Sequence, residues 1–324
     1  MLKNSNILIL SAGRRVELIE RFKRAKERQK IDGKIVAVDL SNTAPAIYFA
    51  DAHYLVPRID SDEYIDSIID VCKKENIDLI VPTIDTELLK LSQNREIIEK
   101  EASVKLLLSR EEVIQICRNK KNTQKFFEEN KFGVPKLLND DDIKAGNYKF
   151  PLFIKPLDGS SSINTFKVTS KEELDFFMNY IKKPMVQEFV EGEEYSVDVF
   201  CDFEANPITI VPRRRLATRS GEISKGLVVK DQEIIEDVKR MLDILKPIGH
   251  ITIQCMKTKK GIEYIEINPR FGGGAPMSID AGADSCENLY RLLKGERLYY
   301  NENYTDKALF VRFDNSIMIK TDEE

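Results

Sequence analysis

The first third of the chain alternates short apolar runs with amphipathic stretches, and this alternation restricts the fold more than any other feature. The apolar runs are short and continuous, as in parallel strands that are covered on both faces. Strands that alternate with helices imply right-handed crossovers and an open parallel α/β sheet. The expected strands are residues 6–10, 34–39, 78–83 and 104–108.

The clearest of the intervening helices is expected within residues 61–78. Asp60 followed by Glu63 predicts a capping pair at its start. Five apolar side chains fall on one face of this helix, which is typical of a helix that packs on a sheet. They are Tyr64, Ile65, Ile68, Ile69 and Cys72.

A second region begins near residue 110 and follows a different pattern. Two helices are expected first, and Gly133 with Pro135 marks the end of the second. Several later segments alternate in or near period two, as antiparallel strands with one buried face do. The expected strands are residues 150–156, 163–169, 184–190, 194–202, 206–212, 250–256 and 262–268, with helices at 170–182 and 231–246 and a hairpin around Asp314–Asn315.

Composition argues against several classes of function. With only two histidines, His53 and His250, the chain cannot build a multi-histidine zinc centre. Five cysteines without a CxxC pair indicate free thiols in a reducing compartment. A net charge of −4 argues against a nucleic-acid partner. Because no apolar run is long enough for a signal core or a membrane span, we expect a cytoplasmic protein without a membrane partner.

The turn after the first expected strand, SAGRRVE, contains a single glycine, Gly13. A dinucleotide-binding turn needs three glycines, so the sequence disfavours an NAD-dependent oxidoreductase built on this domain. Arg14 and Arg15 still lie between a strand and a helix, where an anion could dock. An ordinary turn with two solvated arginines is the alternative.

A loop rich in hydrogen-bond donors follows the strand that ends at Lys155 and Pro156. Backbone N–H groups and hydroxyls in such a loop can wrap a triphosphate, and the lysine adds a positive charge for the phosphates. The GxxxxGK pattern of a Walker loop is absent, and an ordinary serine-rich hairpin is the alternative. The loop residues are Gly159, Ser160, Ser161 and Ser162.

A polar turn over residues 187–195 separates two expected strands. The backbone of Glu188 and Val190 could hydrogen-bond an adenine edge, and a carboxylate a few residues later could hold ribose hydroxyls. An acidic hairpin without a ligand is the alternative.

The segment IEINPRFGGG carries the most information about chemistry. Glu266 and Asn268 are two residues apart on an expected strand, so their side chains share one face. Oxygen ligands without His or Cys suit Mg²⁺ bound together with phosphates. Arg270 adds a planar guanidinium that can donate hydrogen bonds to a phosphoryl oxygen. The glycines at 272–274 indicate that the backbone approaches a ligand closely. The residues expected to point into a core instead are Ile265 and Ile267. An edge strand facing solvent is the alternative.

Together with Lys120 and Lys121 at a helix start, these motifs resemble the ATP-grasp superfamily in order and spacing, most closely its carbamoyl-phosphate-synthase large-chain type. The resemblance spans nearly the whole chain. It implies a preATP-grasp open parallel α/β domain over residues 1–114 and a two-lobed ATP-grasp fold with antiparallel sheets over 115–324. The parts implied for the second domain are a small lid lobe at about 120–190, a larger catalytic lobe at about 191–300 and a C-terminal hairpin at 301–324.

The resemblance also implies roles for individual residues. The implied nucleotide-binding set is Lys120, with Lys121 as its alternative, Lys155, a flap at residues 158–162, the hinge residues Glu188 and Val190, and the ribose carboxylate Glu194. The implied metal ligands are Gln254, Glu266 and Asn268. Arg270 is implied to face the transferred phosphoryl group.

ATP-grasp enzymes activate a carboxylate as an acyl phosphate, which an amine then attacks. The resemblance therefore implies an ATP- and Mg²⁺-dependent carboxylate–amine ligase that releases ADP and phosphate, with Mn²⁺ as an alternative metal. Its partners would be small-molecule carboxylates and amines, and a homodimer is compatible with this function. The alternatives are a half-size carbamoyl phosphate synthase and a non-catalytic ATP sensor.

Two segments are candidates for contact with the second substrate. The first is a basic segment that is either a substrate-binding surface or an exposed loop. Its cations are Arg213, Arg214, Arg215, Arg219 and Lys225, and Lys225 is a catalytic candidate. The second follows an expected strand at its C-terminal end, where α/β proteins bind ligands. It contains Thr83, Asp85 and Glu87, which could instead cap a helix.

Overall fold

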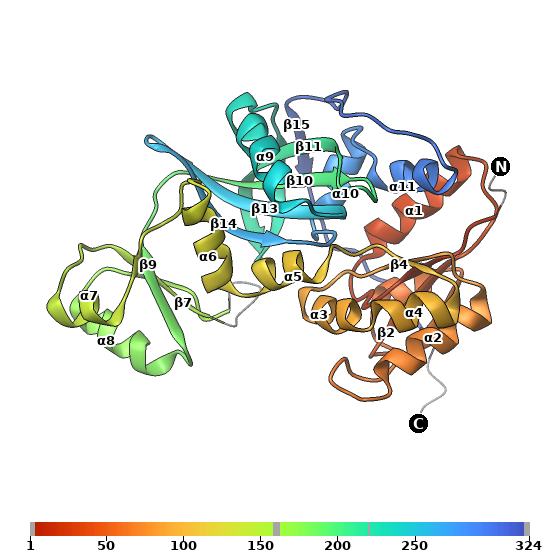
Figure 1. Cartoon of the computed structure of the whole chain (residues 1–324), viewed down its shortest axis with the longest axis horizontal. Helices are drawn as coiled ribbons and strands as arrows, with labels where there is room; N and C mark the ends of the chain where they lie inside the picture. The colour runs from red at the N-terminus through yellow and green to blue at the C-terminus, as the bar shows by residue number, and fades with distance from the viewer. Residues whose placement is uncertain (1–3, 158–162, 220, 321–324) are drawn as a thin grey trace.

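In the part of the chain that the structure describes, three β-sheets are surrounded by helices (Figure 1). The structure is a computed structural model that describes residues 4–157, 163–219 and 221–320. No helix within these ranges has both the length and the apolar surface needed to cross a lipid bilayer.

The N-terminal third forms the open parallel sheet that its alternating pattern predicts, with the strand order β3-β2-β1-β4-β5. Its strands are β1 (Ile7–Ile9), β2 (Ile35–Asp39), β3 (Ala52–Leu55), β4 (Leu79–Val81) and β5 (Lys105–Leu106). The helices between them are α1 (Val16–Arg28), η1 (Pro45–Phe49), α2 (Tyr64–Glu75), α3 (Asp85–Gln93) and α4 (Arg95–Ala102). Sequence analysis missed β3 because its side chains alternate between half-buried and exposed and give no continuous apolar run.

The helix expected within residues 61–78 is α2, and its predicted apolar face is buried against the sheet. The predicted capping pair is wrong. Glu63 occupies the N-cap position without a side-chain hydrogen bond, and Asp60 accepts hydrogen bonds from Arg58 instead. The helix is therefore held by its buried face rather than by a cap.

A four-stranded antiparallel sheet with the order β6-β9-β7-β8 forms a small lobe, seen at the left of Figure 1. Two helices, α5 (Glu111–Arg118) and α6 (Lys120–Glu129), lead into it. Its elements are β6 (Leu137–Leu138), α7 (Asp140–Ala145), β7 (Leu152–Pro156), β8 (Phe166–Val168), α8 (Lys171–Tyr180) and β9 (Pro184–Glu188). This lobe has its own apolar core, which includes Leu152, Ile154 and Leu174.

A six-stranded antiparallel sheet with the order β14-β13-β10-β11-β12-β15 forms the larger lobe. Its strands are β10 (Glu193–Cys201), β11 (Pro207–Arg219), β12 (Glu222–Val228), β13 (Gly249–Thr258), β14 (Gly261–Asn268) and β15 (Ala308–Val311). Its helices are α9 (Gln232–Leu245), α10 (Ala275–Asp280) and α11 (Ser285–Leu293).

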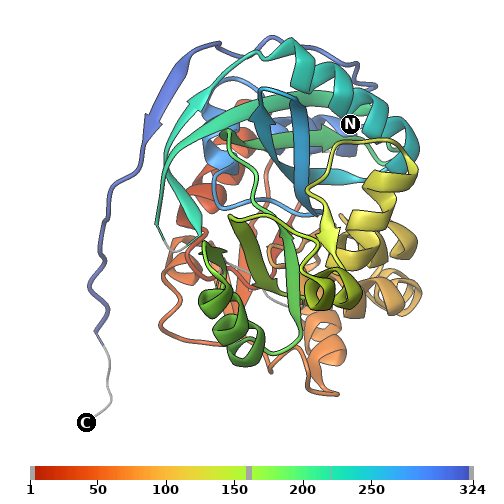
Figure 2. The same cartoon turned by 90° about the vertical axis from the view of Figure 1, so that its left-hand side faces the viewer.

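Two expectations about this lobe are corrected. The basic segment is a strand pair, because β11 extends to Arg219 and pairs antiparallel with β12. The expected C-terminal hairpin is absent among residues 301–320, because β15 pairs with β12 and the described residues after it form no second strand. In Figure 2 these last residues run along the outside of the molecule.

The N-terminal sheet and the larger lobe share one apolar core. Helix α1 contacts both α10 and α11, and the ring of Phe22 lies edge-on to the rings of Phe271 and Tyr290. All three rings are fully buried. The segment after the glycines at 272–274 therefore packs against helix α1, and this contact holds the larger lobe next to the N-terminal sheet.

Candidate functional site

A cavity of about 730 Å³ is lined by all three sheets and by the helices that connect them. The N-terminal sheet contributes Thr83 and Asp85, which follow β4. The small lobe contributes Lys155 and Glu188, and the larger lobe contributes the polar face around Glu266. The cavity therefore gathers most of the residues that the sequence motifs single out.

The polar floor of the cavity is one face of the six-stranded sheet. Cross-strand partners share a face of an antiparallel sheet, so side chains in one row point the same way. The register places four polar residues in such a row across β14, β13, β10 and β11, and all four line the cavity: Glu266, Gln254, Ser196 and Arg213. Asn268 and its cross-strand partner Thr252 lie one step further along the same face.

One side chain of β14 differs from its predicted orientation. The two-residue period predicts that Ile265 points into the core with Ile267, but Ile265 is only half-buried, whereas Ile267 is buried in the core of the larger lobe. The register of β13 and β14 shifts between Gln254 and Cys255, and Ile265 is the extra residue of the resulting bulge. A bulge changes the direction of side chains next to it, which the two-residue period of the sequence cannot show.

The three predicted metal ligands lie together. Glu266 is the direct cross-strand partner of Gln254, and Asn268 donates a hydrogen bond from Nδ2 to Oε1 of Glu266 at 2.8 Å. Within the described residues no group of three His, Cys, Asp or Glu side chains could hold a metal by itself. One carboxylate and two amide oxygens nevertheless fit Mg²⁺, which commonly takes its other ligands from substrate phosphates and water.

Arg270 connects this face to the N-terminal sheet. Its Nη2 and Nε atoms lie 2.7 and 3.1 Å from Oδ2 of Asp85, the first residue of α3. Thr83 and Asp85 line the cavity, and their contact with an acceptor stays a prediction. Glu87 instead has a structural role. It is fully buried and accepts hydrogen bonds from the backbone of Thr83 and from the Tyr64 hydroxyl.

The two lysines expected to bind phosphates face the cavity from the small lobe and from α6. Lys155 is nearly fully buried, and burial lowers its pKa to about 8. Lys120 donates from Nζ to the carbonyl oxygens of Pro156 and Leu157, at 3.0 and 3.1 Å. Lys121 is not among the lining residues. The predicted flap residues Gly159, Ser160, Ser161 and Ser162 lie outside the described residues.

The expected adenine hinge lies at the cavity wall, where Glu188 and Val190 are lining residues. The N–H group of Glu188 donates to the carbonyl oxygen of Lys136 at 2.9 Å. Glu188 can therefore offer an adenine edge its carbonyl oxygen but not its N–H group.

Glu194, the expected ribose carboxylate, lines the cavity beside Arg215, with Oε1 of the carboxylate 3.3 Å from Nη1 of the guanidinium. Burial raises the pKa of Glu194, and the nearby Glu266 carboxylate raises it further against the opposing effect of Arg215.

The basic segment is divided by its strand geometry. Arg213 and Arg215 line the cavity, whereas Arg214 points to the other face and pairs with Glu193. The other two cations lie away from the cavity. Arg219 is exposed and pairs with Asp314, and Lys225 is exposed on β12 and is not a lining residue. The position of Lys225 therefore does not support the catalytic role expected for it.

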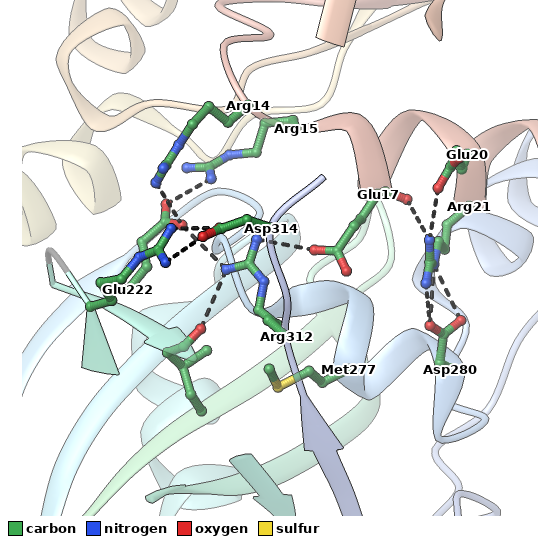
Figure 3. A network of polar contacts seen from close by, with 12 residues as sticks. Arg14, Arg15, Glu17, Glu20, Arg21, Glu222, Met277, Asp280, Arg312 and Asp314 are labelled. Carbon is green, nitrogen blue, oxygen red and sulfur yellow. Dashed lines mark hydrogen bonds and ion pairs between the residues drawn. The ribbon is translucent and has the colours of Figure 1, made fainter. Parts of the chain in front are cut away.

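Sequence analysis missed an ion-pair cluster at one end of the cavity. Glu222, at the start of β12, lies 2.8 Å from Arg15 and 3.4 Å from Arg312 (Figure 3). Arg14 lies further away, at 3.6 Å. Arg15 and Glu222 both line the cavity. The sequence places Arg15 in a turn where an anion could dock, but nothing local in the sequence indicates a partner 207 residues away.

Two family models match the chain, one over the N-terminal parallel sheet and one over most of the two antiparallel sheets. Residues 7–107 match the PylC-like N-terminal domain, and residues 117–274 match the ATP-grasp domain. D-alanine–D-alanine ligase from Francisella philomiragia is 31% identical over 148 residues, which are 42% of this chain and 50% of that protein. The chain thus aligns with about half the length of this relative.

Similar solved structures extend over almost the whole chain. The biotin carboxylase domain of 2-oxoglutarate carboxylase from Hydrogenobacter thermophilus, solved with MgADP and bicarbonate, has a TM-score of 0.73 at 16% identity and covers 94% of this chain and 73% of its own. An L-amino acid ligase from Bacillus licheniformis has a TM-score of 0.67 at 17% identity, with 91% and 75% covered. At these identities the likeness establishes the fold.

Proposed function

Because the chain belongs to the ATP-grasp superfamily, we propose that it is an ATP-dependent carboxylate–amine ligase that releases ADP and phosphate. The observation that carries this proposal is a single cavity face. On it Gln254, Glu266 and Asn268 lie together, next to Arg270 and opposite the buried Lys155 of the small lobe. Phosphoryl transfer needs positioning and charge neutralisation more than a protein nucleophile, and this face offers both.

The chain's own cations would neutralise the triphosphate. Lys155 lies at the end of β7, and its buried ammonium group has lost most of its hydration, so an anionic phosphate would be a favourable partner. Lys120 reaches the segment immediately before residues 158–162. Together the two lysines would fix the nucleotide between the small lobe and the larger sheet.

Gln254, Glu266 and Asn268 would hold Mg²⁺ through oxygen atoms, with Glu266 as the charged ligand. When bound, the metal would neutralise charge on the phosphate oxygens. The Asn268 side chain would then turn its amide oxygen toward the ion, giving up its hydrogen bond to Glu266.

The proposed reaction has two steps. A carboxylate oxygen of the acceptor attacks the γ-phosphorus of ATP, the bond to ADP breaks, and an acyl phosphate forms. An amine nitrogen then attacks the acyl carbon, phosphate leaves with the former carboxylate oxygen, and the nitrogen loses a proton. Arg270, already oriented by Asp85, would contact the transferred phosphoryl oxygens through its remaining N–H groups.

Hydroxylamine trapping tests the proposal without knowledge of the natural amine. The protein is incubated with ATP, Mg²⁺, hydroxylamine and single carboxylates, beginning with the common L-amino acids, D-alanine and small dicarboxylates. We expect at least one carboxylate to give a hydroxamate together with equal amounts of ADP and phosphate. AMP and pyrophosphate as products would contradict the acyl-phosphate route. Tight MgATP binding without turnover on any carboxylate would instead favour a nucleotide sensor.

A further inference from the structure

One arginine of the basic segment has a position that the proposed nucleotide site does not explain. Arg213 is only 1% exposed, yet it lines the cavity. Its neighbour in the cavity, Arg215, is paired with Glu194 at the nucleotide end, so its position already has an explanation. A fully buried guanidinium in a cavity wall requires an anchor and, for each N–H group that faces the cavity, an acceptor.

The anchor is Asp198, the residue two positions after Ser196 on β10. Nε and Nη2 of Arg213 donate to the two carboxylate oxygens of Asp198, at 2.6 and 3.0 Å. The same carboxylate accepts hydrogen bonds from Thr252 and Ser278, at 3.1 and 2.6 Å. Burial tends to raise the pKa of Asp198, but Arg213 and His250 outweigh it and hold the pKa well below its usual range. The guanidinium is therefore locked in one orientation.

Within the residues that the structure describes, the third nitrogen of Arg213 has no comparable partner. Among the described residues, the one contact recorded for Nη1 is with the thioether sulfur of Met277 at 4.0 Å, a weak acceptor at a long distance. A Cβ atom added to Gly274 would lie 2.6 Å from this nitrogen. Only a glycine therefore leaves Nη1 room at this point of the cavity.

The sheet register relates this donor to the phosphate site. Arg213 lies at one end of the cross-strand row that has Glu266 at the other, with Gln254 and the small Ser196 between them. Three strand spacings separate the ends, about 14 Å between backbones, and long side chains from both ends shorten this gap. A small molecule that reaches the phosphoryl group at Glu266 and Arg270 would therefore fill the space beside Ser196 and meet Nη1 of Arg213.

We infer that Arg213 binds the carboxylate that the enzyme phosphorylates, and that Gly274 keeps this position open. The inference deepens the proposed ligase function and rests on it. Because Asp198 already balances the charge of Arg213, the contact would be a directed hydrogen bond to one carboxylate oxygen, leaving the other free to attack the γ-phosphorus.

The test uses two variants and a matched control in the hydroxylamine assay, with whichever of the named carboxylates gives hydroxamate. Arg213→Lys replaces the planar guanidinium by an ammonium group. Gly274→Ala places a Cβ atom 2.6 Å from Nη1 and 3.0 Å from Cζ of Arg213, so it blocks Nη1 and displaces the guanidinium while keeping its charge. In both, we expect KM for the carboxylate to rise about 10- to 100-fold, with KM for MgATP unchanged. Arg214→Lys, one residue away on the opposite face, should leave both constants unchanged.

The outcomes separate the inference from the proposed function. Unchanged KM for the carboxylate in Gly274→Ala would overturn the inference while leaving ligase activity intact, and this variant decides alone if Arg213→Lys does not fold. An equal rise in Arg214→Lys would also overturn it. Absence of hydroxamate from the unaltered protein with every carboxylate would contradict the proposed function, and the inference would be lost with it.

Discussion

The two ends of the cavity are built in different ways. At the proposed nucleotide end, the proposed metal ligands come from two adjacent strands, and Lys155 lies near the end of a strand in another sheet. At the opposite end, the first turn of the chain meets the start of β12 and the tail, where Arg15, Glu222 and Arg312 form ion pairs (Figure 3). The first end uses short local motifs, and the second is assembled only when distant segments fold together.

This difference matches the two tasks of the proposed site, which are binding of a nucleotide with its metal and selection of one acceptor. A nucleotide and its metal impose the same demands wherever they bind, so short motifs suffice to meet them. An acceptor site must match one particular molecule, and loops from separate domains can vary independently to do so. We therefore expect substitutions at the nucleotide end to lower turnover or MgATP affinity, and substitutions at the opposite end to change KM for the acceptor.

The largest effect is expected for Glu266→Gln, which removes the one carboxylate from the three predicted metal ligands. Loss of this charge should lower kcat by about 1,000-fold or more, because several kcal/mol of charge stabilisation disappear. The matched control is Glu263→Gln on the same strand, which does not line the cavity. Comparable loss of activity in both variants would show that the strand, and not the ligand position, matters.

The next largest effect concerns Lys155. Lys155→Met should weaken MgATP binding about 10- to 100-fold, since a buried charge contact is lost. Burial lowers the pKa of this lysine to about 8, so its ammonium form is mostly present at pH 7 and mostly absent at pH 9. Affinity for MgATP should therefore fall as the pH rises through 8, and binding near pH 9 should take up a proton.

Calorimetry in two buffers with different ionisation enthalpies measures this proton uptake at pH 9. Lys155→Met should abolish the uptake as well as weaken binding. Proton uptake that persists unchanged in the variant would assign the titration to another group and remove Lys155 from the phosphate site.

Asp85→Asn is expected to have an intermediate effect. Asp85 lies in the N-terminal domain and forms an ion pair with Arg270 of the larger lobe. The variant therefore tests whether this contact between the two domains supports turnover. We expect kcat to fall about 10-fold with little change in KM for ATP, because the guanidinium would lose its fixed orientation. A rise in KM for ATP with unchanged kcat would place Asp85 in nucleotide binding instead.

The ion pair between Arg15 and Glu222 should contribute less. Both side chains are partly exposed, so a double-mutant cycle with Arg15→Gln and Glu222→Gln should give a coupling of about 1 kcal/mol in the free energy of unfolding. Either single variant should raise KM for the acceptor without altering MgATP affinity. A change confined to MgATP affinity would assign this cluster to the nucleotide end.

The smallest effect is expected for Lys225→Gln. The side chain is exposed on β12 and lies outside the cavity lining, so stability should change by no more than about 0.5 kcal/mol and the turnover rate should not change. A large drop in turnover, comparable to that expected for Asp85→Asn, would restore the catalytic role that sequence analysis gave to Lys225.

Sequence patterns predicted those strands whose spacing of apolar residues follows directly from which side chains are buried. Continuous apolar runs located β1, β2, β4 and β5, and the two-residue period of IEIN placed Glu266 and Asn268 on one face. The same reasoning missed β3, whose alternating burial gives only a weak signal. It also misplaced Ile265, because a bulge has no signature in the spacing of residues.

The acceptor end could not be predicted for a different reason. Arg213 and Lys225 lie in one basic segment, and their charges look equivalent in the sequence. Strand geometry buries Arg213 against Asp198 in the cavity wall and leaves Lys225 exposed. Which cation faces the cavity depends on the register of β11 against β10 and β12, and the register follows from contacts across the whole sheet.

The fate of one oxygen atom tests the central claim most directly. A carboxylate that supports turnover is labelled with oxygen-18 on its carboxyl group, and the phosphate released in the presence of hydroxylamine is analysed by phosphorus NMR. If the γ-phosphoryl group is transferred to the carboxylate at the Glu266 and Arg270 face, one labelled oxygen should appear in inorganic phosphate. Unlabelled phosphate, or label found in AMP, would contradict the account.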